Sequence, residues 1–178
     1  MDHEADRADI TASLAGDGEA YRRIVQRHQS PIARRMRRFA RDAATVEELV
    51  QDVFVEAYFS LRRFSGRAPF EHWLNRIATR VGYAFLKKRQ KQMKFAGNAI
   101  ALENCIATEP ANPDEAAERL HRVLDQLSPR DRLVVTLLHL ENRTVAETAE
   151  LANWSQTMVK VQAFRARAKL RKLLERTS

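Results

Sequence analysis

The chain has 178 residues, with 31 Lys and Arg against 23 Asp and Glu, and its formal net charge is +8. This length allows one domain with a full core or two small ones, and the excess of positive charge favours a polyanionic partner such as nucleic acid. A single cysteine, Cys105, excludes a disulfide framework and a cysteine-built zinc site. Apolar residues recur almost everywhere with a helical period, so we expect an all-α fold.

The polar residues 1–16 are expected to be either frayed or a short first helix. They do not resemble a secretory signal, and the longest apolar stretch, Leu133 to Leu140, is too short to cross a bilayer. We therefore expect a soluble cytoplasmic protein with no membrane insertion. A longer helix is expected to start at Asp17, and Pro31 should kink or divide it after Ser30.

The chain is organised around a helix expected over residues 45–61. Thr45 with Glu48 three positions later predicts a capping box at its start. An apolar stripe at helical spacing predicts its buried side. The stripe consists of Val46, Leu49, Val50, Val53, Ala57, Tyr58 and Leu61.

The opposite side of this helix is acidic and is not interrupted by Lys or Arg. Like charges four residues apart repel one another, by about a few tenths of a kcal/mol per pair. In a basic chain, the pattern indicates either an ordinary solvated face or a docking surface for a positively charged partner. The face carries Glu47, Glu48, Gln51, Asp52 and Glu56.

A loop over residues 62–69, marked by Gly and Pro, leads into a helix that begins at Phe70. Phe70 and Trp73 fall on its inward stripe, whereas Phe64 in the loop is more open. Its outward side is basic, and residues 87–94 contain no acid. Cations can follow phosphates while rings stack on bases, so this segment is suited to single-stranded nucleic acid.

Helical periodicity disappears over residues 96–112, which predicts a flexible linker between two small domains, residues 17–95 and 113–178. Start signals at Asn112, Ser128 and Thr144 predict successive helices in the second domain. Ser155 should cap a long basic last helix. Two helices joined by a short turn indicate a helix-turn-helix, although structural α-hairpins share the pattern.

The two halves together resemble the extracytoplasmic-function group of bacterial sigma factors, the smallest relatives of sigma-70. The resemblance runs from about Asp17 to Leu174, in the family's order and spacing. In the first half it is carried by V-E-E-L-V-Q-D-V-F-V-E-A-Y and F-S-G-R-A-P-F-E-H-W-L-N-R-I-A. In the second half it is carried by L-S-P-R-D-R-L-V-V-T-L-L-H-L, T-V-A-E-T-A-E-L-A and V-K-V-Q-A-F-R-A-R-A-K-L.

This resemblance implies a promoter-specificity subunit with no catalytic residue, cofactor or metal. Its implied partners are core RNA polymerase, promoter DNA and an anti-sigma factor. The acidic face Glu47, Glu48, Gln51, Asp52 and Glu56 would dock on the clamp helices of the largest polymerase subunit. The −10 element would be opened and held by Phe64, Ser65, Arg67, Arg76, Arg80, Lys87 and Lys88. The −35 element would be read by Ser155, Gln156, Thr157, Lys160, Val161, Gln162, Arg165 and Arg167.

The chain departs from the family pattern at several positions. Arg80 stands where Asn is usual, Ala84 where an acid is frequent, and Thr157-Met158 where Gly-Thr is common. Val161-Gln162 replaces a common Ser-Arg. These differences leave the fold intact, but they put the promoter sequence in question.

Three other functions compete with this interpretation. An enzyme is disfavoured because the chain has no phosphate-binding glycine loop, G-x-S-x-G or H-E-x-x-H, and Glu118-x-x-His121 lacks the second motif of a di-iron site. A stand-alone helix-turn-helix regulator would leave the acidic helix unexplained. A general nucleic-acid-coating protein would bind any sequence and would dissociate steeply with salt.

Overall fold

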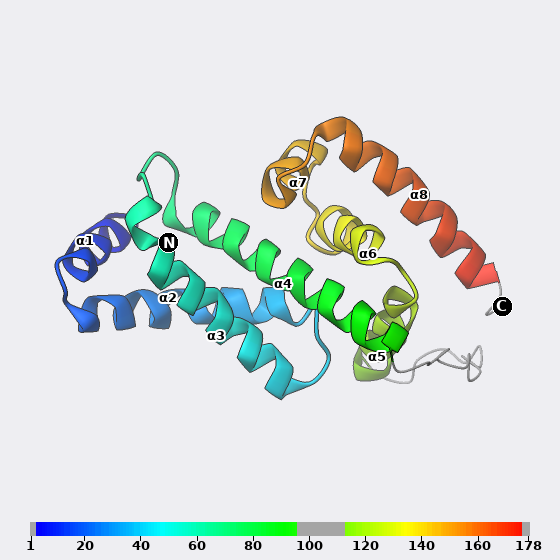
Figure 1. Ribbon diagram of the computed structural model, residues 1–178, viewed down its shortest axis with the longest axis horizontal. Coiled ribbons are helices and arrows are strands. Elements are labelled where there is room, and N and C mark those ends of the chain that lie inside the picture. The colour runs from blue at the N-terminus through cyan, green and yellow to red at the C-terminus, as the bar shows by residue number, and fades with distance from the viewer. Residues whose placement is uncertain (1–2, 96–112, 176–178) are drawn as a thin grey trace. The chain divides into compact units, whose positions relative to one another are not determined.

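The computed structural model describes residues 3–95 and 113–175 (Figure 1). All regular structure in these ranges is helical, which confirms the expected all-α class. The helices are α1 (His3–Leu14), α2 (Gly18–Met36), α3 (Ala43–Ser60), α4 (Phe70–Phe95), α5 (Pro113–Asp125), α6 (Pro129–Val135), α7 (Val145–Ala152) and α8 (Gln156–Glu175). A 3-10 turn, Leu61–Arg63, follows α3, and a π-helical turn, Thr136–Leu140, continues α6.

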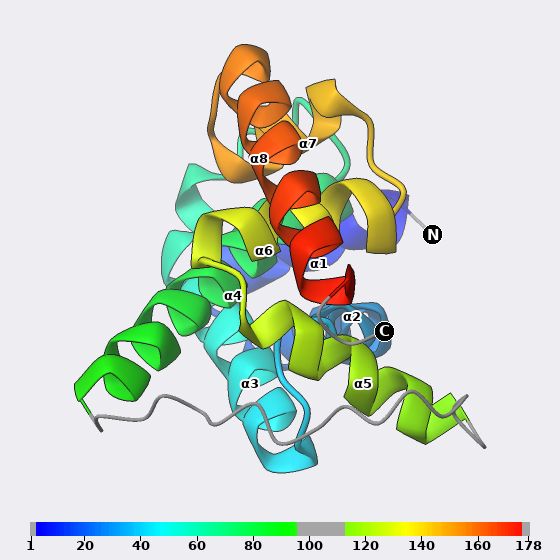
Figure 2. The same cartoon turned by 90° about the vertical axis from the view of Figure 1, so that its right-hand side faces the viewer.

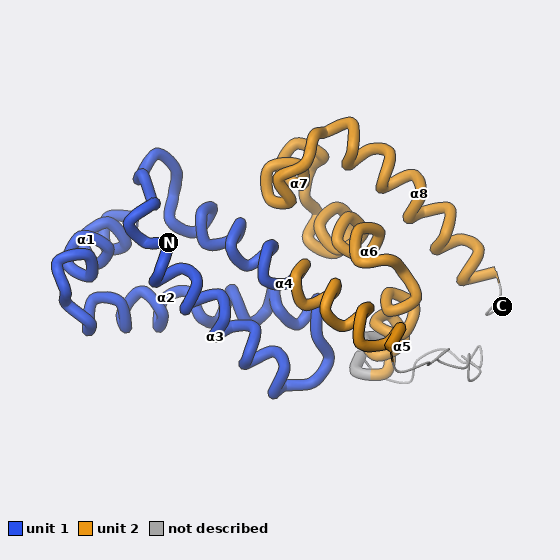
Figure 3. The backbone as a smooth tube through the Cα atoms, viewed as in Figure 1, with its two compact units in different colours: residues 1–82 blue, residues 83–178 orange. Residues whose placement is uncertain are grey.

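The chain forms two compact units, residues 1–82 and 83–178, drawn in blue and orange in Figure 3. The division falls inside α4. The predicted linker, residues 96–112, lies outside the described residues, as does Cys105. The domain bounds 17–95 and 113–178 therefore stay predictions.

In the first unit, α1 is a helix packed on α2, which decides between the two expectations for residues 1–16. Two buried carboxylates of α1, those of Asp6 and Asp9, hold this helix against α2. Asp6 accepts hydrogen bonds from Arg27 Nη1 at 2.5 Å and lies 2.9 Å from His28 Nε2. Asp9 accepts from Arg27 Nη2 at 2.6 Å. The bond from Arg27 lowers the pKa of Asp9 against the effect of burial, and Arg23 adds to the lowering.

Helix α2 begins where it was expected to start: Asp17 is its N-cap and accepts hydrogen bonds from the backbone N–H groups of Glu19 and Ala20. Pro31 was predicted to kink or divide this helix, and the division is wrong, since α2 runs unbroken to Met36. Ile24, Ile32 and Met36 are buried on either side of the proline. Their packing stabilises a continuous helix despite the lost backbone hydrogen bond.

Helix α3 begins three residues earlier than predicted. Asp42, not Thr45, is its N-cap, and the Asp42 carboxylate accepts a hydrogen bond from the Thr45 N–H at 2.7 Å. Most of the predicted stripe is buried, but Tyr58 is 53 % exposed and Phe54 takes an inward place instead. Tyr58 lies edge-on against Tyr21, with ring centroids 4.9 Å apart.

The second unit has a core of Leu124, Leu127, Val135 and Ala166. Helix α8 packs on α6 and on α7 (Figure 2). The expected caps are confirmed at Ser128, at Thr144 with its complete capping box, and at Ser155, whose hydroxyl accepts from the Met158 N–H at 3.1 Å.

The turn between α7 and α8 depends on Asn153. This residue adopts a left-handed conformation (φ 56°) and closes α7 through hydrogen bonds to Ala149 and Glu150. Asn tolerates this conformation better than most residues. The sharp reversal fixes where α8 starts relative to α7, which is the geometry of a helix-turn-helix.

Candidate polymerase and nucleic-acid interfaces

The structure places the predicted acidic face on the exposed side of α3. Glu47, Glu48, Gln51 and Asp52 are all exposed. Glu56 differs, because it is half-buried and forms an ion pair with Arg80 of α4. One predicted polymerase-docking residue therefore contacts one predicted −10 residue within the first unit.

Sequence reasoning missed the apolar part of this surface. Val55 is 54 % exposed and Phe59 is 81 % exposed, and the two lie four residues apart, beyond Gln51 and Asp52 along α3. Aromatic side chains are enriched at protein interfaces, and neighbouring exposed apolar residues are typical of such a contact. The sequence does carry a signal for this apolar part: Val55 and Phe59 form an apolar pair at helical spacing that lies outside the predicted buried stripe.

The loop between α3 and α4 carries the first predicted −10 residues. Phe64 is half-buried, and its ring packs edge-on against Phe70 and tilted against Trp73, with centroid distances of 5.4 and 5.5 Å. Ser65 and Arg67 are exposed. Phe70 is fully buried, as expected, whereas Trp73 is only half-buried.

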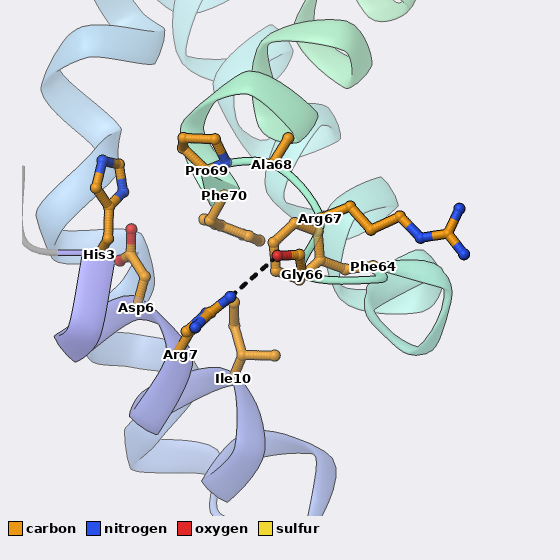
Figure 4. A pocket seen from close by; sticks show the side chains of 10 residues that line it. All are labelled: His3, Asp6, Arg7, Ile10, Phe64, Gly66, Arg67, Ala68, Pro69 and Phe70. Atoms are coloured by element: carbon orange, nitrogen blue, oxygen red, sulfur yellow. Dashed lines mark hydrogen bonds between the residues drawn. The ribbon is translucent and has the colours of Figure 1, made fainter.

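Helix α1 supports this loop, which the sequence did not indicate. The Arg7 guanidinium donates a hydrogen bond to the Gly66 carbonyl at 3.2 Å (Figure 4). Gly66 has a φ of 69°, a left-handed conformation that favours glycine. A shallow cavity of about 210 Å³ lies between α1 and the loop, and Figure 4 shows the Arg67 guanidinium pointing away from it.

The four predicted cations of α4, namely Arg76, Arg80, Lys87 and Lys88, are all exposed. The Lys87 ammonium lies 4.7 Å from the centre of the Tyr83 ring. In contrast, Arg35 of α2 is buried. Its guanidinium donates to Asn75 Oδ1 at 3.1 Å and to Thr79 Oγ1 at 2.7 Å, and so ties α2 to α4.

Helix α8 presents most of the predicted −35 residues to solvent. Gln156, Thr157, Lys160, Val161, Arg165 and Arg167 are exposed, and Ser155 acts as the cap. Gln162 is half-buried, and its amide donates to Asp131 Oδ1 of α6 at 2.5 Å. Phe164, which was not among the predicted residues, is 70 % exposed.

Asp131 is a buried anchor between α6 and α8. It accepts hydrogen bonds from Gln162, from the Lys169 ammonium and from the Ser128 hydroxyl. Burial by itself raises the pKa of Asp131, but these donors, Lys169 first, outweigh it and hold the pKa below its ordinary value. The carboxylate is thus ionised at neutral pH and fixes the rotation of α8 about its axis.

Within the described ranges, no three His, Cys, Asp or Glu side chains are grouped so that they could hold a metal ion. The helices that the structure describes include none that is long and apolar enough to cross a membrane.

Comparison with known proteins assigns both halves of the chain. The family model for Sigma-70 region 2 matches residues 24–92, and the model for Sigma-70, region 4 matches residues 117–170. RNA polymerase sigma factor CnrH of Cupriavidus metallidurans is 28% identical over 185 residues, covering 98% of this chain and 97% of that protein. The ECF RNA polymerase sigma-E factor of Escherichia coli K12 is 28% identical over 163 residues, with 85% of each chain covered.

A solved structure supports the fold. The structure of CnrH in complex with the cytosolic domain of CnrY superimposes with a TM-score of 0.64 at 26% identity, covering 98% of this chain and all of that one.

Proposed function

This chain belongs to the extracytoplasmic-function group of the sigma-70 family, and from its surfaces we propose how it engages core RNA polymerase and a promoter. Sigma factors direct polymerase to promoters and are not enzymes, so the described residues act by binding and by melting DNA. The observation that carries the proposal is that Glu47, Glu48 and Asp52 of α3 are all exposed, on a helix without Lys or Arg, in a chain of net charge +8.

The acidic face of α3 is proposed to dock on a positively charged helical surface of the polymerase. Glu48 and Asp52 lie four residues apart and are exposed, so both can reach one partner. Their mutual repulsion is relieved when cations of the partner approach. Glu47, Gln51 and Glu56 complete the proposed contact.

The loop after α3 and the basic side of α4 are proposed to hold the opened −10 strand. Taking a base out of the stack costs a few kcal/mol. A protein without an energy source must offset that cost with ring contacts and phosphate contacts. Phe64 and Trp73 supply half-buried rings beside exposed Ser65 and Arg67, and the cations of α4 lie next along the chain.

Helix α8 is proposed to read the −35 element in the major groove, which admits an α-helix. Its exposed start offers Gln156 and Thr157 to base edges, while Lys160, Arg165 and Arg167 are placed to meet phosphates. Gln162 was first predicted to read the −35 element, but its amide is hydrogen-bonded to Asp131. We propose that it positions α8 instead of contacting a base.

We also infer that this protein has an inhibitory protein partner, an anti-sigma factor. We infer that it acts in the cytoplasm, where promoters and polymerase are found. The inference of a partner is supported by the solved complex of CnrH with the cytosolic domain of CnrY. The relevant test is whether this chain co-purifies with a stoichiometric protein that blocks its transcription activity.

Run-off transcription tests the proposed function. Core polymerase is mixed with a library of promoter fragments, with and without this protein. We expect initiation from a subset of fragments that share two spaced motifs. The proposal fails if adding this protein does not increase initiation by core polymerase and the protein does not co-purify with core. A helix-turn-helix regulator then becomes the better assignment.

Charge reversal tests the docking surface separately. Glu48→Lys combined with Asp52→Lys should reduce core binding at least tenfold, since each attractive contact becomes repulsive. A matched control reverses two exposed acids outside α3, Glu118→Lys with Glu175→Lys, and should leave core binding unchanged. Unchanged affinity in the α3 variant, with its helical content intact, would remove α3 from the interface.

A further inference from the structure

An uncharged line runs along the exposed side of α8. Thr157, Val161, Phe164 and Ala168 follow one another at spacings of four, three and four residues, so they lie in one row on a helix with 3.6 residues per turn. All four are exposed, and Phe164 is 70 % exposed. Every member presents a methyl group or a ring to solvent.

Cations border this line on both sides. Lys160 and Arg171 are eleven residues apart, three helical turns, and form one row. Arg165 and Lys172 are seven residues apart, two turns, and form the other. All four are exposed. An apolar strip between two rows of positive charge is complementary to a groove in a partner molecule whose two edges are negatively charged and whose base is less polar.

The Asp131 anchor determines that this strip, and not another side of α8, faces outward. Gln162 and Lys169 both bind the buried Asp131 carboxylate, which fixes one side of α8 against α6. Val159, Ala163 and Ala166 are buried on that packed side. The uncharged line is therefore held on the side of α8 that points away from the core of the second unit.

The major groove of B-DNA has the matching chemistry. Phosphates line its two edges, and Lys and Arg bind them without regard to sequence. On its floor the only methyl group of an unmodified base is the C5-methyl of thymine, which Ala, Thr and Phe side chains contact. A protein partner would not require cations on both sides of the strip.

We propose that Val161 and Phe164, with Thr157 and Ala168 beside them, read thymine methyl groups in the −35 element. The inference rests on the proposed role of α8 as the −35 reader and adds the chemical feature that it selects. Discrimination at these positions is then apolar: it favours T·A pairs through the methyl group, not through a hydrogen bond.

Deoxyuridine tests this directly, because it pairs like thymine and lacks only the methyl group. A promoter obtained from the run-off library is prepared with each −35 thymine, on either strand, replaced in turn by deoxyuridine. Binding of the reconstituted holoenzyme is then measured. At one or more positions we expect the replacement to weaken binding about fourfold, the effect of one methyl group no longer buried.

The variants locate the reader. Phe164→Ala and Val161→Ala holoenzymes should bind the thymine and deoxyuridine promoters equally at the position that each residue reads. Leu174→Ala is the matched control, because Leu174 is an exposed apolar residue of α8 (54 %) that lies off the line. It should keep the wild-type preference for thymine. Thermal unfolding of each variant shows that the second unit is folded.

Three results would overturn the inference: selected −35 elements without T·A pairs, equal wild-type binding of thymine and deoxyuridine at every position, or a thymine preference that persists in both variants. These are distinguishable from failure of the proposed function. In all three the wild-type protein still directs run-off transcription, whereas failure of the function removes transcription from the unmodified promoter.

Discussion

At the scale of single residues, the most consequential side chain of the second unit is Asp131. It is fully buried, and three side chains from α8 and from the start of α6 donate hydrogen bonds to it. A buried carboxylate is tolerated only when it is paired in this way. The same contacts orient the face of α8 that is proposed to meet DNA, so stability and recognition depend on one group.

We predict that Asp131→Asn lowers the free energy of unfolding by about 1–3 kcal/mol at pH 7, because the Lys169 ammonium loses its charged acceptor. Denaturant titration measures this value. The control Glu150→Gln removes an exposed carboxylate of α7 and should change stability by less than about 0.5 kcal/mol. A neutral Asp131→Asn would show that the network contributes nothing.

The same residue gives a pH dependence with a definite sign. The pKa of Asp131 is lowered in the folded protein. Its contribution is therefore fully present above the unfolded-state pKa, about 3.9, and is lost as the pH falls through the lower native value. The midpoint temperature of thermal unfolding, measured between pH 3 and pH 7, should therefore fall less steeply toward acid pH in Asp131→Asn than in the wild type.

At the scale of helices, α4 packs closely on the segment that follows α2, and Gly82 makes this possible. A Cβ atom at Gly82 would lie 2.8 Å from two atoms of the Phe39 ring, which is fully buried. Overpacking of this kind costs about 1–3 kcal/mol. The gain in helix propensity from Gly to Ala is about 1 kcal/mol, so the clash should dominate.

We therefore predict that Gly82→Ala destabilises the protein by roughly 1 kcal/mol, the difference between those two effects. Gly18→Ala is the matched control, since no atom lies within 4 Å of a Cβ at that helical position. It should be neutral or stabilising. If both substitutions stabilise the protein, the close contact between α4 and Phe39 does not restrict residue 82.

The starts of helices were predicted from sequence wherever the signal was local. Asp17, Ser128, Thr144 and Ser155 each accept a hydrogen bond from a backbone N–H two or three residues later. Such a contact depends on a few adjacent residues and not on the rest of the fold. At α3 two capping residues compete, and Asp42 is the one used, which spacing alone could not decide.

Features that depend on tertiary packing were not predicted. Pro31 does not divide α2, because residues on both sides of it are buried. Arg35 is buried because Asn75 and Thr79 of a distant helix accept its hydrogen bonds. For the same reason the sequence could not show that Gln162 contacts α6 and not DNA. Its hydrogen-bond partner, Asp131, is 31 residues away in the chain.

At the scale of the whole molecule, the acidic face and the basic surfaces lie on separate helices. The acids of α3 are exposed in the first unit, whereas the exposed side of α8 in the second unit carries cations from Lys160 to Lys172. Opposite charges carried by different helices suit a protein that binds two partners of opposite charge together. One is a cationic protein surface, and the other is DNA.

This arrangement predicts different DNA binding by the free protein and by the holoenzyme. Alone, the protein has only its cationic surfaces, so its binding should be weak, nearly independent of sequence, and should fall with salt in proportion to the phosphates contacted. Bound to core polymerase, both promoter elements are contacted at once, and the combined contacts should give a specific footprint. Footprinting at two salt concentrations, with and without core, measures the difference.

The variant with Glu48→Lys and Asp52→Lys separates the two states. It should retain or slightly increase the salt-sensitive DNA binding of the free protein, because its positive charge is higher, while the footprint that depends on core is lost. A specific footprint of equal strength without core would contradict this account and favour a regulator that acts through α7 and α8 alone. The charge on α3 therefore decides when the basic surfaces become selective, although on this proposal α3 itself does not touch DNA.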